Sequence, residues 1–205
     1  MRGNRSELAV PEAIFTIRGL TKSYGDNLVI DGIDFEVYAG ESLVILGRSG
    51  SGKSVTLRQL NGLEKPDSGS VVFDGTEITT LEESELVPLR RRVAMLFQGG
   101  ALFDSGTVYG NVSFPLREHT DLADDEIAEI VEKKLAMVRL SGVDDLLPAD
   151  LSGGMKKRVA LARSLALDPE VVLFDEPTTG LDPMTSATIG QLIRSTQKDM
   201  TTTSV

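Results

Sequence analysis

A glycine-rich stretch holds the residues whose types and spacing are best suited to chemistry. Residues 47–54 read Gly-Arg-Ser-Gly-Ser-Gly-Lys-Ser, the pattern G-x-x-x-x-G-K-S of a phosphate-binding P-loop. A triphosphate needs several backbone N–H groups that point inward at once, and glycines let the chain wrap closely enough to supply them. The candidate nucleotide-binding residues here are Gly47, Arg48, Ser49, Gly50, Ser51, Gly52, Lys53 and Ser54. Lys53 supplies a point charge for the β- and γ-phosphates, and Ser54 offers a hydroxyl to Mg²⁺.

The segments on either side of this loop give it a structural context. Residues 42–46, Ser-Leu-Val-Ile-Leu, predict a buried parallel strand, and residues 54–61 predict a helix that ends at Gly62. The phosphates then lie at a helix N-terminus, where free N–H groups and the helix dipole favour anions. The alternative is a flexible Gly/Ser turn, which these flanking segments disfavour.

Two acidic residues follow another apolar run. Residues 171–174, Val-Val-Leu-Phe, predict a buried strand with Asp175 and Glu176 at its carboxyl end. Asp175 is placed to hold the Mg²⁺ shell, directly or through water, and Glu176 to polarise the attacking water. The alternative is that both acids merely end the strand. The glycine-rich loop upstream favours the catalytic interpretation.

Two further polar residues are candidates, each with an ordinary alternative. Gln98 follows a predicted strand over 93–97, at the edge where α/β sheets bind ligands, within reach of Mg²⁺ or an attacking water. A loop glutamine without a ligand explains this stretch equally well. Tyr24 lies in a predicted loop over 22–27, where its ring is able to stack on a purine. A half-buried surface tyrosine is the commoner case.

A second helix start also favours anions. Residues 151–155, Leu-Ser-Gly-Gly-Met, precede a helical pattern that Asp168-Pro169 ends. Two phosphate-facing helix ends in one chain make sense if Ser152, Gly153 and Gly154 serve the γ-phosphate of a second protomer. The alternative is an ordinary N-cap serine followed by flexible glycines.

The remaining segments suggest how these residues are positioned. Alternating patterns over 13–19 and 28–37, and a run over 70–75 that ends in an Asp-Gly turn, predict a small antiparallel sheet beside the parallel core. Residues 101–116 are apolar and interrupted, and 121–140 have the apolar spacing of an amphipathic helix. We therefore predict an α/β core with an antiparallel β subdomain and a helical insertion. The predicted units are 1–98, 99–160 and 161–205.

Composition excludes several classes of function. The chain has 205 residues, 40% hydrophobic content, no cysteine and a formal net charge of −10. One sizeable core is therefore expected, without disulfides or cysteine metal sites. The negative charge argues against a general nucleic-acid binder. No apolar run reaches the length that spans a bilayer, so any membrane role is expected to come through a partner.

Together these motifs resemble the nucleotide-binding subunit of an ABC transporter, in that family's order and at compatible spacing. The motif residues are 47–54, Gln98, 151–155, 171–176 and Gly180-Leu181-Asp182. The resemblance implies a RecA-like P-loop NTPase core with ABC ATPase architecture. It also implies that Tyr24 stacks on adenine, that Asp182 belongs to the nucleotide site, and that Gln98 links this site to a membrane partner.

Finer features resemble one branch of that family. Residues 98–104 and 111–118, with Met155 in place of the usual glutamine, look like the Mla/Mce-type ATPases, which drive lipid movement across bacterial envelopes. The family places a switch histidine just past the strand that 201–205 begins, and His119 lies elsewhere, in the helical insertion. The sequence therefore resembles a truncated ATPase. We expect it to bind ATP but to hydrolyse it poorly.

The resemblance implies a head-to-tail dimer of two copies. Residues 47–54, Tyr24, Gln98 and Asp175 of one copy hold Mg·ATP, the Ser152 helix end of the other closes over the γ-phosphate, and Glu176 acts as general base. Residues 99–116 are expected to hold a helix of a transmembrane permease, which places the protein on the cytoplasmic face of the cell membrane. Two alternatives stay open: a soluble ABC-type ATPase acting on ribosomes or DNA, and a non-hydrolysing regulatory nucleotide-binding module.

Overall fold

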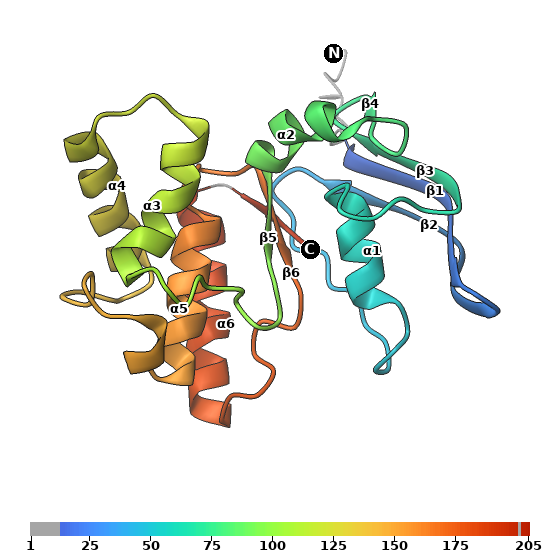
Figure 1. The fold of residues 1–205 in the computed structure, drawn as a ribbon. Coiled ribbons are helices and arrows are strands. Elements are labelled where there is room, and N and C mark those ends of the chain that lie inside the picture. The colour runs from blue at the N-terminus through green and yellow to red at the C-terminus, as the bar shows by residue number, and fades with distance from the viewer. Residues whose placement is uncertain (1–12, 201) are drawn as a thin grey trace, which may run out of the picture.

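The computed structural model describes residues 13–200 and 202–205, which form two sheets with helices packed beside them (Figure 1). The first sheet is antiparallel, with strand order β2-β1-β3-β4. Its strands are β1 (Ala13–Tyr24), β2 (Asn27–Tyr38), β3 (Ser68–Phe73) and β4 (Thr76–Glu77). Phe15 of β1 lies opposite Phe73 of β3, with ring centroids 4.8 Å apart, and both side chains are buried. The predicted antiparallel sheet is therefore confirmed.

The second sheet is parallel, and several candidate site residues follow the carboxyl ends of its strands. It contains β5 (Val93–Leu96), β6 (Val171–Phe174) and β7 (Thr203–Ser204), in that spatial order. Leu96 pairs with Phe174, and the N–H of Asp175 donates to the carbonyl of Leu96 at 2.9 Å. The segments that follow β5 and β6 therefore leave the sheet at the same edge.

The predicted strand over 42–46 is wrong for most of its length. Ser42 makes a single parallel bridge to Ser204, and the Leu43 N–H donates to the Ser204 carbonyl at 2.9 Å. Val44 and Leu46 are 70% and 88% exposed. Because β7 holds only two residues, no strand of the described chain lies alongside 44–46 to take up its backbone hydrogen bonds.

Six α-helices complete the described chain. They are α1 (Lys53–Leu60), α2 (Glu83–Arg92), α3 (Val108–His119), α4 (Asp124–Met137), α5 (Gly153–Ser164) and α6 (Pro183–Met200). Helix α1 ends before Gly62, and α4 occupies the predicted helix over 121–140. The boundary predicted at residue 160 falls within α5, and residues 1–12 of the first predicted unit lie outside the described residues. The division into three units stays a prediction.

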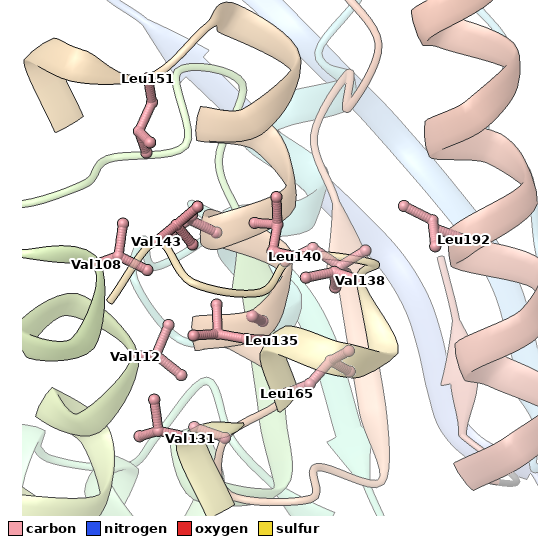
Figure 2. Packing of buried hydrophobic residues seen from close by; sticks show 14 of the residues in the cluster. Val108, Val112, Val131, Leu135, Val138, Leu140, Val143, Leu151, Leu165 and Leu192 are labelled. Carbon is pink, nitrogen blue, oxygen red and sulfur yellow. The ribbon is translucent and has the colours of Figure 1, made fainter. Parts of the chain in front are cut away.

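Figure 1 shows α3, α4 and α5 on one side of β5 and β6, and α1 with the antiparallel sheet on the other. The helices enclose their own buried cluster, where Val112 of α3 lies near Val131 and Leu135 of α4 (Figure 2). No helix in the described residues combines the length and the apolarity that crossing a membrane requires.

Leu135 offers a test of this cluster, because it is only 2% exposed (Figure 2). Leu135→Ala removes buried methyl groups and leaves a cavity, so we expect the free energy of unfolding to fall by about 3 kcal/mol. Leu147, which is 40% exposed, provides the control. Urea denaturation of both variants measures the difference, and equal midpoints for the two would contradict the packing.

Candidate functional site

The glycine-rich loop turns directly into α1. Gly52 is the N-cap residue, with φ at +90°, and makes no side-chain cap to the first turn. A Cβ at this position would lie 3.1 Å from atoms of Val29 and Ile30, and this φ is strained for any other residue, so the turn requires glycine. The N–H groups of the first turn of α1 have no side-chain cap, an arrangement that suits an anion.

Lys53 and Ser54, the first residues of α1, connect the loop to the carboxyl end of β6. The Lys53 ammonium donates to the carbonyls of Gly47 and Arg48, both at 3.1 Å, and lies 3.5 Å from Oε1 of Glu176. The Ser54 hydroxyl donates to Oδ1 of Asp175 at 2.6 Å, and Asp175 is buried. The predicted loop residues and the predicted acids are therefore neighbours in space.

Glu176 is held in an unusual position. Its φ is +46°, in the left-handed region, which costs a residue with a Cβ about 1 kcal/mol or more. Its Oε2 accepts hydrogen bonds from Nε2 of Gln98 at 3.1 Å and from the hydroxyl of Thr179 at 3.0 Å. The chain thus turns sharply after Asp175 and aims the two neighbouring carboxylates at different partners.

Lys53, Ser54, Gln98 and Glu176 border an open cleft of about 280 Å³, called here the phosphate cleft. Its lining residues are Tyr24, Val29, Ser49, Gly50, Gly52, Lys53, Ser54, Val55, Gln98 and Glu176. The structure therefore brings Tyr24, Gln98 and Glu176 to the glycine-rich loop, although they are far apart in the sequence.

Tyr24 is not in a loop as predicted, because it is the last residue of β1 and pairs with Asn27. Its ring is 48% exposed, and its hydroxyl donates to the carboxylate of Glu64. Partial burial, together with Glu64, raises the pKa of the Tyr24 hydroxyl. The half-exposed ring thus lies at the cleft, with the Lys22 ammonium 5.6 Å from its centroid.

The remaining predicted residues lie elsewhere in the chain. Ser152 is the N-cap of α5, where its hydroxyl accepts from the Met155 N–H at 3.3 Å. Oδ1 of Asp182 accepts from the N–H groups of Met184 and Thr185, both at 3.0 Å, at the start of α6. Hydrogen bonds from the Thr185 side chain and backbone lower the pKa of Asp182. Neither Ser152 nor Asp182 lines the phosphate cleft of the same chain.

Two side-chain oxygens at and beside the cleft are of the kind that bind a magnesium ion. The Asp175 carboxylate and the Ser54 hydroxyl already meet at 2.6 Å, and Mg²⁺ prefers carboxylate and hydroxyl oxygens.

Two residues of the site, Glu64 and Thr179, were not predicted from the sequence. Glu64 accepts a hydrogen bond from Tyr24, and Thr179 donates one to Glu176. For Thr179 a signal existed, since it stands three residues after Glu176. For Glu64 there was none, because it lies 40 residues from Tyr24.

Comparisons with known proteins show which proteins the chain is similar to. A family model described as ABC transporter matches residues 30–179. A "Probable ribonucleotide transport ATP-binding protein mkl" of Mycobacterium bovis is 48% identical over 177 residues, which cover 86% of this chain and 49% of the relative. An "Intermembrane phospholipid transport system ATP-binding protein MlaF" of Haemophilus influenzae is 42% identical over 192 residues, covering 94% of this chain and 73% of the relative.

Among solved structures, the dimeric post-hydrolysis structure of the ATP-binding cassette MJ0796, bound to ADP and Pi, superposes with a TM-score of 0.85 at 32% identity. The match covers 93% of this chain and 86% of that one. The chain spans about half the length of the mycobacterial relatives that it matches. The matched residues include the glycine-rich loop, the Ser-Gly-Gly helix start and both acids of the site. This chain therefore belongs to the ABC transporter family.

Proposed function

We propose that the chain binds Mg·ATP in the phosphate cleft and hydrolyses it, as the ATP-binding subunit of a transporter. One observation carries this proposal: Lys53, the Ser54–Asp175 hydrogen bond and Glu176 all surround the N-terminus of α1. A phosphate cradle, a cation ligand and a candidate base are thus within reach of one another. These are the parts that phosphoryl transfer to water requires.

Each residue has a role that its position supports. Lys53 would leave the loop carbonyls to bind the β- and γ-phosphates, and the half-exposed ring of Tyr24 would stack on adenine. Ser54, Asp175 and the Gln98 side-chain oxygen would hold Mg²⁺, which neutralises phosphate charge when bound. Glu176 accepts the proton of the attacking water, and Gln98 and Thr179 fix its carboxylate.

A second copy is proposed to complete the site. Ser152 and Gly153 are exposed at the start of α5, away from the cleft of their own chain. This helix start, where the Ser152 hydroxyl accepts from the Met155 N–H, suits the γ-phosphate bound to a partner in a head-to-tail dimer, with Gly154 and Asp182 alongside. The MJ0796 cassette, which has the same fold, is described as dimeric.

A groove on another face suits a membrane partner. It has a volume of about 400 Å³ and includes Phe97, Phe103, Phe114 and Arg163 in its lining. The rings of Phe103 and Phe114 meet edge to face at 4.8 Å between centroids, and both are about half exposed. We propose that a short helix of a transmembrane permease docks here, over residues 99–116, on the cytoplasmic side. The MlaF relative suggests lipid as the cargo.

Binding and hydrolysis by the unmodified chain test the core of this proposal. Titration with a fluorescent ATP analogue should give saturable binding in Mg²⁺ that weakens in EDTA, and phosphate release should require Mg²⁺. Binding that does not compete with ATP, or phosphate release unaffected by EDTA, would contradict it.

A further inference from the structure

Helix α5 holds the backbone of the segment that carries Gln98. Three carbonyl oxygens of residues 98–101 accept hydrogen bonds from cations on this helix. The Lys157 ammonium donates to the Gln98 carbonyl. The Arg163 guanidinium donates to the carbonyls of Gly100 and Ala101, both at 2.8 Å. Two cations therefore hold one short segment at both ends.

Close packing joins the segment to the helix between those two ends. Gly100 has φ at +79°, and a Cβ built there would lie 3.2 Å from Cβ of Ala160. Only glycine allows the backbone to approach α5 this closely without strain. The segment is thus positioned by the helix on which it rests, and a displacement of α5 displaces the Gln98 backbone as well.

Burial of the Lys157 ammonium, the cation that contacts Gln98, has a desolvation cost. Lys157 is 8% exposed, and among the described residues it has no carboxylate within 4.0 Å. Burial lowers the pKa of Lys157, although the charge of Asp175 opposes this effect. An apolar side chain of the same length would avoid the desolvation cost. What Lys157 adds over such a side chain is its hold on the Gln98 carbonyl.

We propose that Lys157 is a positioning residue, which sets the place of the Gln98 side chain and through it the carboxylate of Glu176. The contacts run from Lys157 on α5 to the Gln98 backbone, and from Gln98 Nε2 to Oε2 of Glu176 at 3.1 Å. This inference rests on the proposed function.

Lys157→Met tests the inference, because methionine keeps the length and removes the donor. We expect kcat for ATP hydrolysis to fall roughly tenfold, while KM stays within about twofold, because the catalytic group is misplaced but the phosphate cradle is untouched. Lys157→Arg should recover most of kcat. Lys156→Met, at the neighbouring and more exposed lysine, should match the unmodified chain.

Amide hydrogen exchange supplies a readout that does not depend on turnover. Lys157→Met should speed exchange over residues 98–101 and leave α1 unchanged, whereas a merely structural loss would speed exchange in both. Equal kcat and equal exchange for Lys157→Met and Lys156→Met would overturn the inference. Failure of the unmodified chain to bind Mg·ATP would instead overturn the proposed function, and the exchange result would still decide whether Lys157 holds the segment.

Discussion

Replacing Glu176 by glutamine is expected to lower the rate of ATP hydrolysis about a hundredfold and to leave ATP affinity nearly unchanged. A positioned general base contributes roughly a hundredfold or more to such reactions, and an amide cannot accept the proton. The glutamine keeps the shape of the side chain, so its contacts with Gln98 and Thr179 are largely preserved. Lys53 loses the facing carboxylate at 3.5 Å but keeps its charge and its loop contacts, and Ser54 and Asp175, which would hold Mg²⁺, are unchanged.

The measurement is single-turnover phosphate release at saturating ATP, with nucleotide affinity determined separately. Glu129→Gln provides the matched control, because Glu129 is an exposed glutamate on α4, away from the cleft. Light scattering with Mg·ATP should also show a longer-lived dimer for Glu176→Gln, because hydrolysis no longer releases it. Unchanged turnover would remove Glu176 as the base.

The positions of site residues that are close together in the sequence were predictable, because a local motif largely determines its own local structure. The glycine-rich loop, the acids after β6 and the serine start of α5 are each local, and strand, turn and helix preferences place them. Parallel strands also bring their carboxyl ends to one edge, which is why Gln98 and Glu176 meet.

What the sequence did not reveal depends on distant neighbours. Residues 43–46 have the apolar pattern of a strand, but a strand also needs a partner, and β7 reaches this part of the chain only at Ser42 and the Leu43 N–H. The left-handed φ of Glu176 has no signal in residue type, since the turn around it enforces this conformation.

The hydrogen bond from Lys157 to the Gln98 carbonyl joins residues 59 positions apart and could not be predicted from the sequence either. In the sequence, Lys156 and Lys157 look equivalent. Only the packing of α5 buries the second of them against the backbone after β5. Long-range polar contacts of this kind depend on tertiary structure and produce no periodic pattern in the sequence.

Replacing Lys53 by alanine is expected to weaken ATP binding by about a hundredfold or more. The ammonium lies at the mouth of the loop, where it now contacts two loop carbonyls and faces Glu176. Charged hydrogen bonds to phosphate contribute about 1.5–3 kcal/mol each, and each 1.4 kcal/mol is tenfold in affinity. Loss of two such contacts gives the expected size.

Isothermal titration with Mg·ATP measures the loss of affinity. A titration with adenosine then distinguishes a loss of phosphate contacts from a general disruption of the cleft. Lys53 serves the terminal phosphates, so adenosine affinity should stay the same in Lys53→Ala, while ATP affinity collapses. Lys65→Ala, at an exposed lysine outside the cleft, controls for general loss of positive charge. A parallel loss of adenosine binding would point to a collapsed loop. Unchanged ATP affinity would mean that no phosphate lies at the N-terminus of α1, and the assignment of the cleft would fail with it.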